Sequence, residues 1–113
     1  MPSHRPESVG KAVRVALTEI LRVETRDPRL AEIMVTSVKM SKDLRTAKIF
    51  VSATADRQEP SDVIPSLNRA MAFLRRSLAQ RVQLRRTPEL VFALDDSIAH
   101  GALIEQLLNQ LKP

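Results

Sequence analysis

Residues 33–53 read IMVTSVKMSKDLRTAKIFVSA, and this stretch predicts the centre of the fold. Residues 33–41 are rich in β-branched side chains, and residues 47–53 place Ala, Ile and Val on one face with Lys48 and Ser52 on the other. Both patterns are typical of strands. Because only the polar residues 42–46 separate the two segments, we expect the strands to form an antiparallel hairpin.

A helix is predicted ahead of this hairpin. Apolar residues recur at helical spacing from Val9 to Leu21, which gives the segment one wide apolar face. Ser8 is a candidate N-cap for this helix. The helix should end before Asp27 and Pro28, because proline disfavours helical geometry in the residue that precedes it.

A second helical segment is predicted after the hairpin. Residues 67–79 carry Leu, Ala and Met at the spacing of a core-facing stripe. Ser61 or Ser66 could cap this segment, and Pro65 is acceptable only near its start.

A third strand and a last helix complete the predicted order. Residues 90–94 form a short apolar strand, and apolar residues from Ile98 to Leu111 predict a final helix. Three strands with helices before and after them predict a single α+β domain, in which a three-stranded sheet packs on helices.

Length and composition set the class of protein. The chain has 113 residues, a formal net charge of +5 and no Cys, which excludes disulfides and fits a reducing compartment. No apolar run approaches the ~20 residues needed to span a bilayer. We therefore expect one cytoplasmic domain over residues 1–113 with no membrane association, and fraying of residues 1–7 and 112–113.

The positive charge is concentrated in one window. Residues 69–86 contain six Arg and no acidic residue, whereas the rest of the chain is close to neutral. The six are Arg69, Arg75, Arg76, Arg81, Arg85 and Arg86. Clustered Arg predicts a surface that binds phosphate groups of a nucleic acid, since a guanidinium group can contact a phosphate with two donors. The alternative is a solvated basic helix face.

Further basic residues extend this prediction. Lys42 and Arg45, in the connection between the first two strands, are secondary candidates for RNA contact. Lys11 and Arg14 on the first helix are weaker candidates. Arg85 or Arg86 could instead pair with an acidic neighbour, Glu89 or Asp95.

No catalytic or metal site is predicted. The two His, His4 and His100, are far apart in sequence and show no metal-ligand spacing. Asp95 and Asp96 are adjacent, and capping of the final helix by Asp96 or Ser97 explains them better than chemistry. With only two Gly, no glycine-rich phosphate loop can form. We expect no enzymatic activity and no cofactor.

The shortage of aromatic residues limits how RNA could be recognised. The chain has no Trp, no Tyr and three Phe, so it has few aromatic rings on which RNA bases could stack. This favours phosphate contacts to a folded RNA. Two other interpretations stay open: a protein-interaction module that docks an acidic partner without RNA, and a general single-stranded RNA-binding protein.

Several motifs in order along the chain carry a family resemblance. They are Arg26-Asp27-Pro28-Arg29-Leu30, then Val38-x-Met40-Ser41-x-Asp43-Leu44-Arg45-x-Ala47-Lys48-Ile49-Phe50-Val51-Ser52, then Leu74-Arg75-x-x-Leu78, then Leu84-Arg85-Arg86-x-Pro88-Glu89-Leu90-x-Phe92, then Asp95-Asp96-Ser97-Ile98, and Gly101-x-x-Ile104-Glu105-x-Leu107-Leu108. Together they resemble the ribosome-binding factor A family, bacterial assembly factors of the small ribosomal subunit, from about residue 5 to residue 111.

The resemblance implies a particular fold. Members have a type II KH-like domain of order α-β-β-α-kink-α-β-α, in which an Ala-x-Gly kink replaces the GxxG loop of ordinary KH domains. The matching positions are Ala70, Met71 and Ala72, so Ala72 stands where the family has Gly. Because Ala favours a continuous helix, a bend near residues 70–72 is a hypothesis that an unbroken helix from 63 to 80 would contradict. Leu103 is a second departure, at a position where members often carry a basic residue.

The resemblance also implies a function. Members bind 16S rRNA in immature 30S particles, support processing of its 5′ end and maturation, and matter most at low temperature. They have no enzymatic activity, act as monomers and cooperate with an assembly GTPase.

Overall fold

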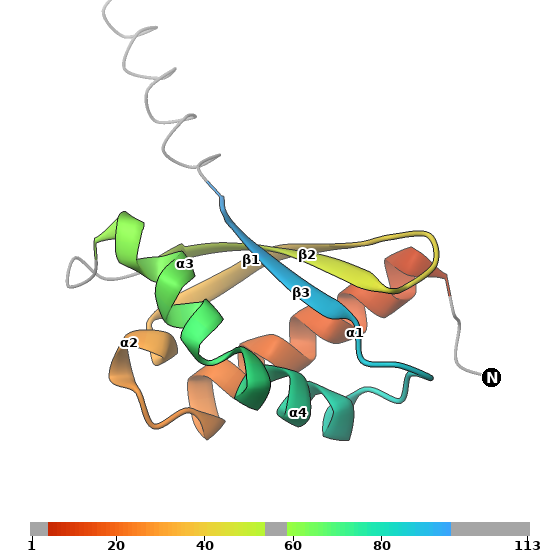
Figure 1. Cartoon of the computed structure of the whole chain (residues 1–113), viewed down its shortest axis with the longest axis horizontal. Helices are drawn as coiled ribbons and strands as arrows, with labels where there is room; N and C mark the ends of the chain where they lie inside the picture. Colours follow the sequence, from red (N-terminus) through yellow and green to blue (C-terminus); the bar gives the residue numbers. More distant parts are fainter. Residues whose placement is uncertain (1–4, 54–58, 96–113) are drawn as a thin grey trace, which may run out of the picture.

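The computed structural model describes residues 5–53 and 59–95, which form a three-stranded sheet with helices against one face (Figure 1). The elements, in chain order, are α1 (Pro6–Glu19), η1 (Ile20–Glu24), α2 (Pro28–Ala31), β1 (Ile33–Met40), β2 (Thr46–Ala53), α3 (Pro60–Arg69), α4 (Met71–Arg81) and β3 (Glu89–Leu94). This is the predicted α+β order. The final helix, with its caps and Leu103, lies outside the described residues.

The sheet confirms the predicted hairpin. β1 and β2 pair antiparallel, from Ile33 opposite Ala53 to Met40 opposite Ala47, with one irregularity between Val35 and Ser37. β3 pairs with β2 in parallel, so β2 is the central strand. A parallel pair needs a crossover connection, and α3 and α4 supply it.

Buried side chains from every layer meet between the sheet and the helices. Ala47, Ile49 and Val51 of β2 are fully buried, as their alternation predicts. Helices contribute Leu17 from α1 and Leu74 from α4, both also fully buried. These contacts fix α1 and α4 against the same face of the sheet (Figure 1).

α1 lies unusually close to the backbone of β1. A Cβ atom placed on Gly10 would lie 3.1 Å from the carbonyl oxygen of Val38, which is closer than most carbon contacts. Glycine therefore allows the helix and strand to approach at this point.

The ends of α1 differ from the prediction. The helix begins at Pro6 with Arg5 as N-cap, and Ser8 is not the cap. Proline suits the first helical position because its missing N–H needs no partner there. At the other end the helix widens into the π-turn η1, where the Thr25 N–H donates to Ile20 O, and Thr25 itself is extended.

The short helix α2 was not predicted from the sequence. It occupies Pro28–Ala31, and the Asp27 carboxylate caps it by accepting a hydrogen bond from the Arg29 N–H at 3.0 Å. Asp27 is the N-cap and Pro28 is the first helical residue, and both residue types are favoured at these positions. This local signal can start a helix of a single turn.

α3 also begins earlier than expected. Its N-cap is Glu59 and Pro60 is its first residue, so neither Ser61 nor Ser66 caps it. The Ser66 hydroxyl instead donates to the Asp62 carbonyl at 2.7 Å. Pro65 consequently lies inside the helix, where its ring removes one backbone donor.

A bend separates α3 from α4, as hypothesised. Ala70, with φ −93° and ψ 9°, ends α3 and precedes α4, so no continuous helix runs from residue 63 to residue 80. The two helices follow different directions on either side of it (Figure 1). Ala72 lies within the first turn of α4, and the change of direction occurs without Gly.

Candidate nucleic-acid interface

The hairpin turn between β1 and β2 is held by one carboxylate. Asp43 Oδ1 accepts hydrogen bonds from the Ser41 hydroxyl at 2.6 Å and from the Arg45 N–H at 3.1 Å. The Ser41 hydroxyl oxygen in turn accepts from the Thr46 N–H at 3.0 Å. These bonds lower the pKa of Asp43 below its ordinary value, the Ser41 bond most. They also fix Leu44 in the left-handed region, with φ 61°.

The segment between α4 and β3 is held beside this turn. The Arg75 guanidinium donates to the carbonyls of Thr87 and Pro88, at 3.0 and 3.2 Å. The Glu89 N–H donates to the Arg45 carbonyl at 2.8 Å. The first bonds anchor the segment to α4, and the last joins it to the hairpin.

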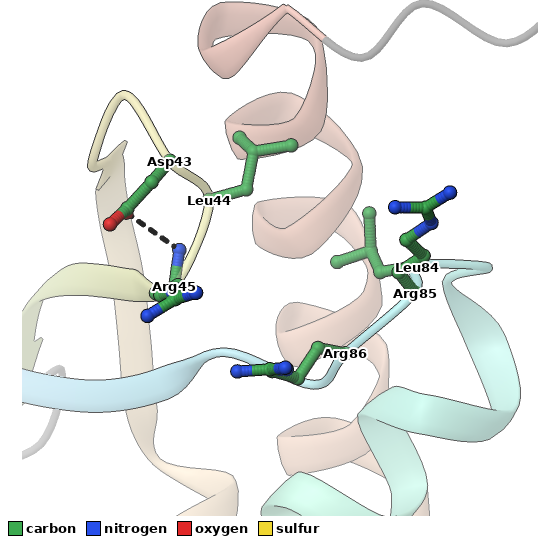
Figure 2. Close-up of a pocket in the computed structure, with 6 residues that line it drawn as sticks. All are labelled: Asp43, Leu44, Arg45, Leu84, Arg85 and Arg86. Atoms are coloured by element: carbon green, nitrogen blue, oxygen red, sulfur yellow. Dashed lines mark hydrogen bonds between the residues drawn. The ribbon is translucent and has the colours of Figure 1, made fainter.

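A basic cavity forms where the two segments meet. It has a volume of about 520 Å³ and is lined by Asp43, Leu44, Arg45, Leu84, Arg85 and Arg86 (Figure 2). We call Arg45, Arg85 and Arg86 the turn cluster. In the described part of the chain, their guanidinium groups donate no hydrogen bond and form no ion pair. The alternative pairing of Arg85 or Arg86 with Glu89 or Asp95 is therefore not observed.

A second concavity, of about 840 Å³, lies at the bend between α3 and α4. Its lining includes Arg69, Arg75 and Arg76 together with Met71 and Ala72 of the bend. Arg76 is exposed and makes no hydrogen bond or ion pair among the described residues. Arg69 donates to the Ser66 hydroxyl at 3.2 Å and remains exposed. We call Arg69 and Arg76 the kink cluster.

Besides Arg69, which donates to Ser66, two of the six predicted Arg have internal partners. Arg75 supports the α4–β3 segment, and Arg81 forms an ion pair with Glu24 that connects α4 to η1. The hydrogen bond from Arg81 lowers the pKa of Glu24. These two side chains are already committed within the fold, which leaves fewer of their donors for a ligand.

The other predicted basic residues lie apart from the cavity. Lys42 is exposed in the hairpin turn but does not line the cavity. Lys11 and Arg14 are exposed on α1, where Lys11 lines a separate groove against residues 81–84.

Sequence reasoning missed Asp43, Leu44 and Leu84 as lining residues. The pattern of Ser41 two residues before Asp43 was a usable signal, because such side chains bond to nearby backbone in turns. Nothing in the sequence indicated that Leu44 would take a left-handed conformation.

The arrangement of these basic residues suits anion binding. Among residues 5–53 and 59–95, no group of three His, Asp or Glu could hold a metal ion. No helix in these same ranges is long and apolar enough to cross a bilayer. Unpaired guanidinium groups on a concave surface can each contact a phosphate with two donors.

Comparisons with known proteins point to one family. The family model described as ribosome-binding factor A matches residues 5–108. A ribosome-binding factor A from Desulfitobacterium hafniense is 40% identical over 112 residues, covering 99% of this chain and 90% of that protein.

Solved structures agree in fold. The crystal structure of ribosome-binding factor A from Thermus thermophilus matches with a TM-score of 0.70 and 31% identity, covering 80% of this chain and 97% of that one. A model of the Thermus thermophilus factor fitted into a cryo-EM map of its complex with 30S matches with a TM-score of 0.61 and 34% identity, covering 75% of this chain and 89% of that one.

Proposed function

The chain belongs to the ribosome-binding factor A family, and from this premise we propose that it binds 16S rRNA on immature 30S particles and supports processing and maturation of that rRNA. The family establishes a KH-like ribosome-binding factor. The related Thermus protein in complex with 30S supports the choice of subunit.

The observation that carries the proposal is the turn cluster. Arg45, Arg85 and Arg86 come from two distant segments and line one cavity, and their guanidinium groups form no hydrogen bond or ion pair in the described part of the chain, although the charge of Arg45 acts on the neighbouring Asp43. Like charges that are held close together repel one another, so this arrangement of three cations is unfavourable without an anionic ligand. Phosphates of rRNA would remove that repulsion, and the kink cluster offers a second basic surface for phosphate contacts.

Charge reversal tests the proposal. We expect Arg45→Glu, Arg85→Glu and Arg86→Glu, combined in one protein, to lower co-sedimentation with 30S particles by a factor of 100 or more. A matched variant, Arg26→Glu, Lys39→Glu and Lys48→Glu, has the same change in net charge at exposed positions away from the cavity that form no ion pair among the described residues. Equal losses in both variants would mean that general charge, and not this surface, carries binding.

Crosslinking separates RNA binding from the rival functions. If the cluster contacts rRNA, ultraviolet crosslinks from assembling particles should map to 16S rRNA and be lost in the triple variant. Crosslinks to proteins alone would favour a module that docks an acidic protein. Equal capture of many unrelated short RNAs would favour a general single-stranded RNA binder.

The finer cellular role forms part of the same proposal. We expect a cytoplasmic monomer without enzymatic activity, acting with an assembly GTPase, whose loss slows growth most at low temperature. Cells lacking it should accumulate precursor 16S rRNA, and the triple variant should fail to restore processing.

A further inference from the structure

We propose that the cavity between the hairpin turn and residues 84–86 binds one unpaired nucleotide of RNA, with the base against Leu44 and Leu84 and its phosphate on the turn cluster. This rests on the proposed function, since the same Arg residues contact phosphate in both. It adds a site for a base to a surface otherwise suited only to the RNA backbone.

The first argument is the apolar wall of the cavity. Leu44 and Leu84 pack partly against the hydrophobic core and also line the cavity. Figure 2 shows both side chains in the space between the turn and residues 84–86, with guanidinium groups around them. A site for phosphate alone needs donors and gains nothing from leucine, whereas the face of a base gains from apolar contact.

The second argument is the conformation of Leu44. Among the described residues, it is the only non-glycine residue with a positive φ. This conformation is unfavourable for a residue with a Cβ, and Gly or Asn would close the same turn with less strain. The Asp43 hydrogen bonds hold the turn that contains Leu44. Residues in such strained conformations are found more often at ligand sites than elsewhere.

The third argument is that the cavity supplies what a base needs without an aromatic ring. Guanidinium planes stack on bases, so Arg45 or Arg86 can cover one face. The volume of about 520 Å³ falls within the range of roughly 300–1,000 Å³ typical of small-ligand sites.

Asp43 adds a preference among bases. Asp43 lines the cavity; its Oδ1 already accepts from the Ser41 hydroxyl and the Arg45 N–H, and its Oδ2 can accept a hydrogen bond from an exocyclic amino group, as carboxylates do from cytosine. Cytosine, adenine and guanine carry such a group and uracil does not. We therefore expect uridine to bind most weakly.

Methyl NMR on the full chain tests the site. The protein, with labelled Leu methyl and Arg Nε groups, is titrated with trinucleotides of cytidine, adenosine and uridine, and with an abasic ribose-phosphate trimer. We expect the cytidine and adenosine trimers to shift the Leu44 and Leu84 methyl signals, and the abasic trimer to shift only the Arg signals. Leu signals that do not move with any trimer, or move equally with the abasic one, would overturn the proposal.

The same titration separates this proposal from the broader one. Arg85 and Arg86 signals that move while the Leu signals stay fixed would leave phosphate binding intact and remove the base site. If neither set moves, while the charge-reversal variant still loses 30S binding, the cavity does not bind single-stranded nucleotides at all.

Variants that keep every charge give an independent measure. Leu44→Gly relieves the positive φ and removes the apolar wall, so we expect about tenfold weaker binding of the cytidine trimer with an unchanged salt dependence. Leu84→Ala should act in the same direction if Leu44→Gly disturbs folding. Val91→Ala, at an exposed side chain of β3 directed away from the core, is the control and should bind normally. Unchanged affinity in both leucine variants would contradict the site.

Discussion

At the scale of single residues, Asp43 stabilises the hairpin turn through bonds that favour its ionised form. The Ser41 hydroxyl and the Arg45 N–H both donate to the same carboxylate oxygen, and both lower its pKa in the folded protein. In the unfolded chain the pKa returns to about 3.9. The stabilisation is therefore complete above that value and is lost as the pH falls through the lower folded value.

This linkage gives a pH-dependent prediction for Asp43→Asn. The native chain should exceed the variant in free energy of unfolding by a constant amount from pH 7 to about pH 5 and by progressively less below about pH 4. Urea unfolding at each pH measures the difference. Ser41→Ala should make the native pH dependence shallower, because it removes the bond with the largest effect on the pKa. A difference that grows in acid would show that the sign is wrong.

Gly10 sets how closely α1 approaches β1. Gly10→Val should lower the free energy of unfolding by about 1–3 kcal/mol, because its side chain would meet the Val38 carbonyl, a backbone atom that cannot move aside. Ala12→Val, on the exposed face of the same helix, is the matched control and should cost only about 0.5 kcal/mol. Equal losses in chemical denaturation would mean that the close approach is not what constrains residue 10.

At the scale of elements, two neighbouring Arg residues of α4 have different roles. Arg75 faces the α4–β3 segment and donates to two backbone carbonyls, whereas Arg76 is exposed beside the bend. Helical periodicity places Arg75 at the flank of the core-facing stripe of Leu74 and Leu78 and Arg76 opposite it, but does not show what Arg75 contacts. The contact of Arg75 depends on the path of residues 82–88, because that path brings the Thr87 and Pro88 carbonyls to its guanidinium group. No regular structure was predicted for this segment from the sequence.

Single alanine substitutions should separate these roles. Arg75→Ala should lower the free energy of unfolding by about 2 kcal/mol, because two charge-assisted hydrogen bonds to backbone are lost. Arg76→Ala should change stability by less than about 0.5 kcal/mol and still weaken binding to 30S particles. Thermal unfolding and co-sedimentation of both variants give the comparison. A stable Arg75→Ala protein with full 30S binding would show that the segment does not depend on this contact.

The elements that were predicted correctly are those with repeating patterns. β2, α1 and α4 are each buried on one side, so apolar residues alternate along β2 and form stripes on α1 and α4. The hairpin and the helices could therefore be predicted from the spacing of apolar residues. The π-turn at Ile20–Glu24, the single turn of α2 and the left-handed Leu44 depend on particular hydrogen bonds to Thr25, Asp27 and Asp43. Such local bonds compete with regular structure and leave no periodic signal.

At the scale of the whole molecule, the charged window predicted from the sequence becomes two separate surfaces. Arg75 and Arg81 are bound to carbonyl and carboxylate partners, and Arg45 joins Arg85 and Arg86 from a distant segment. Composition could locate the excess charge, since residues 69–86 contain it all. It could not predict which guanidinium groups remain available, because that depends on the pairing of β3 with β2.

The two surfaces lie along one helix. Arg69 precedes α4 and residues 84–86 follow it, and the helix of 11 residues has a length of about 16 Å. An RNA that contacts both clusters must therefore extend along α4. Each cluster then contributes phosphate contacts independently, and the salt dependence of binding should report their number.

Alanine variants of each cluster turn this into a measurement. If all five Arg contact one phosphate each, the log–log slope of 30S affinity against salt should be about −3.5, at roughly 0.7 for each phosphate of single-stranded RNA. Removing the turn cluster (Arg45, Arg85 and Arg86 to Ala) should reduce it to about −1.4, and removing the kink cluster (Arg69 and Arg76 to Ala) to about −2.1. A slope unchanged by the first variant would remove the turn cluster from the interface. If instead each variant alone abolishes the salt dependence, the RNA engages the clusters as one unit, because losing either end then releases the whole strand along α4.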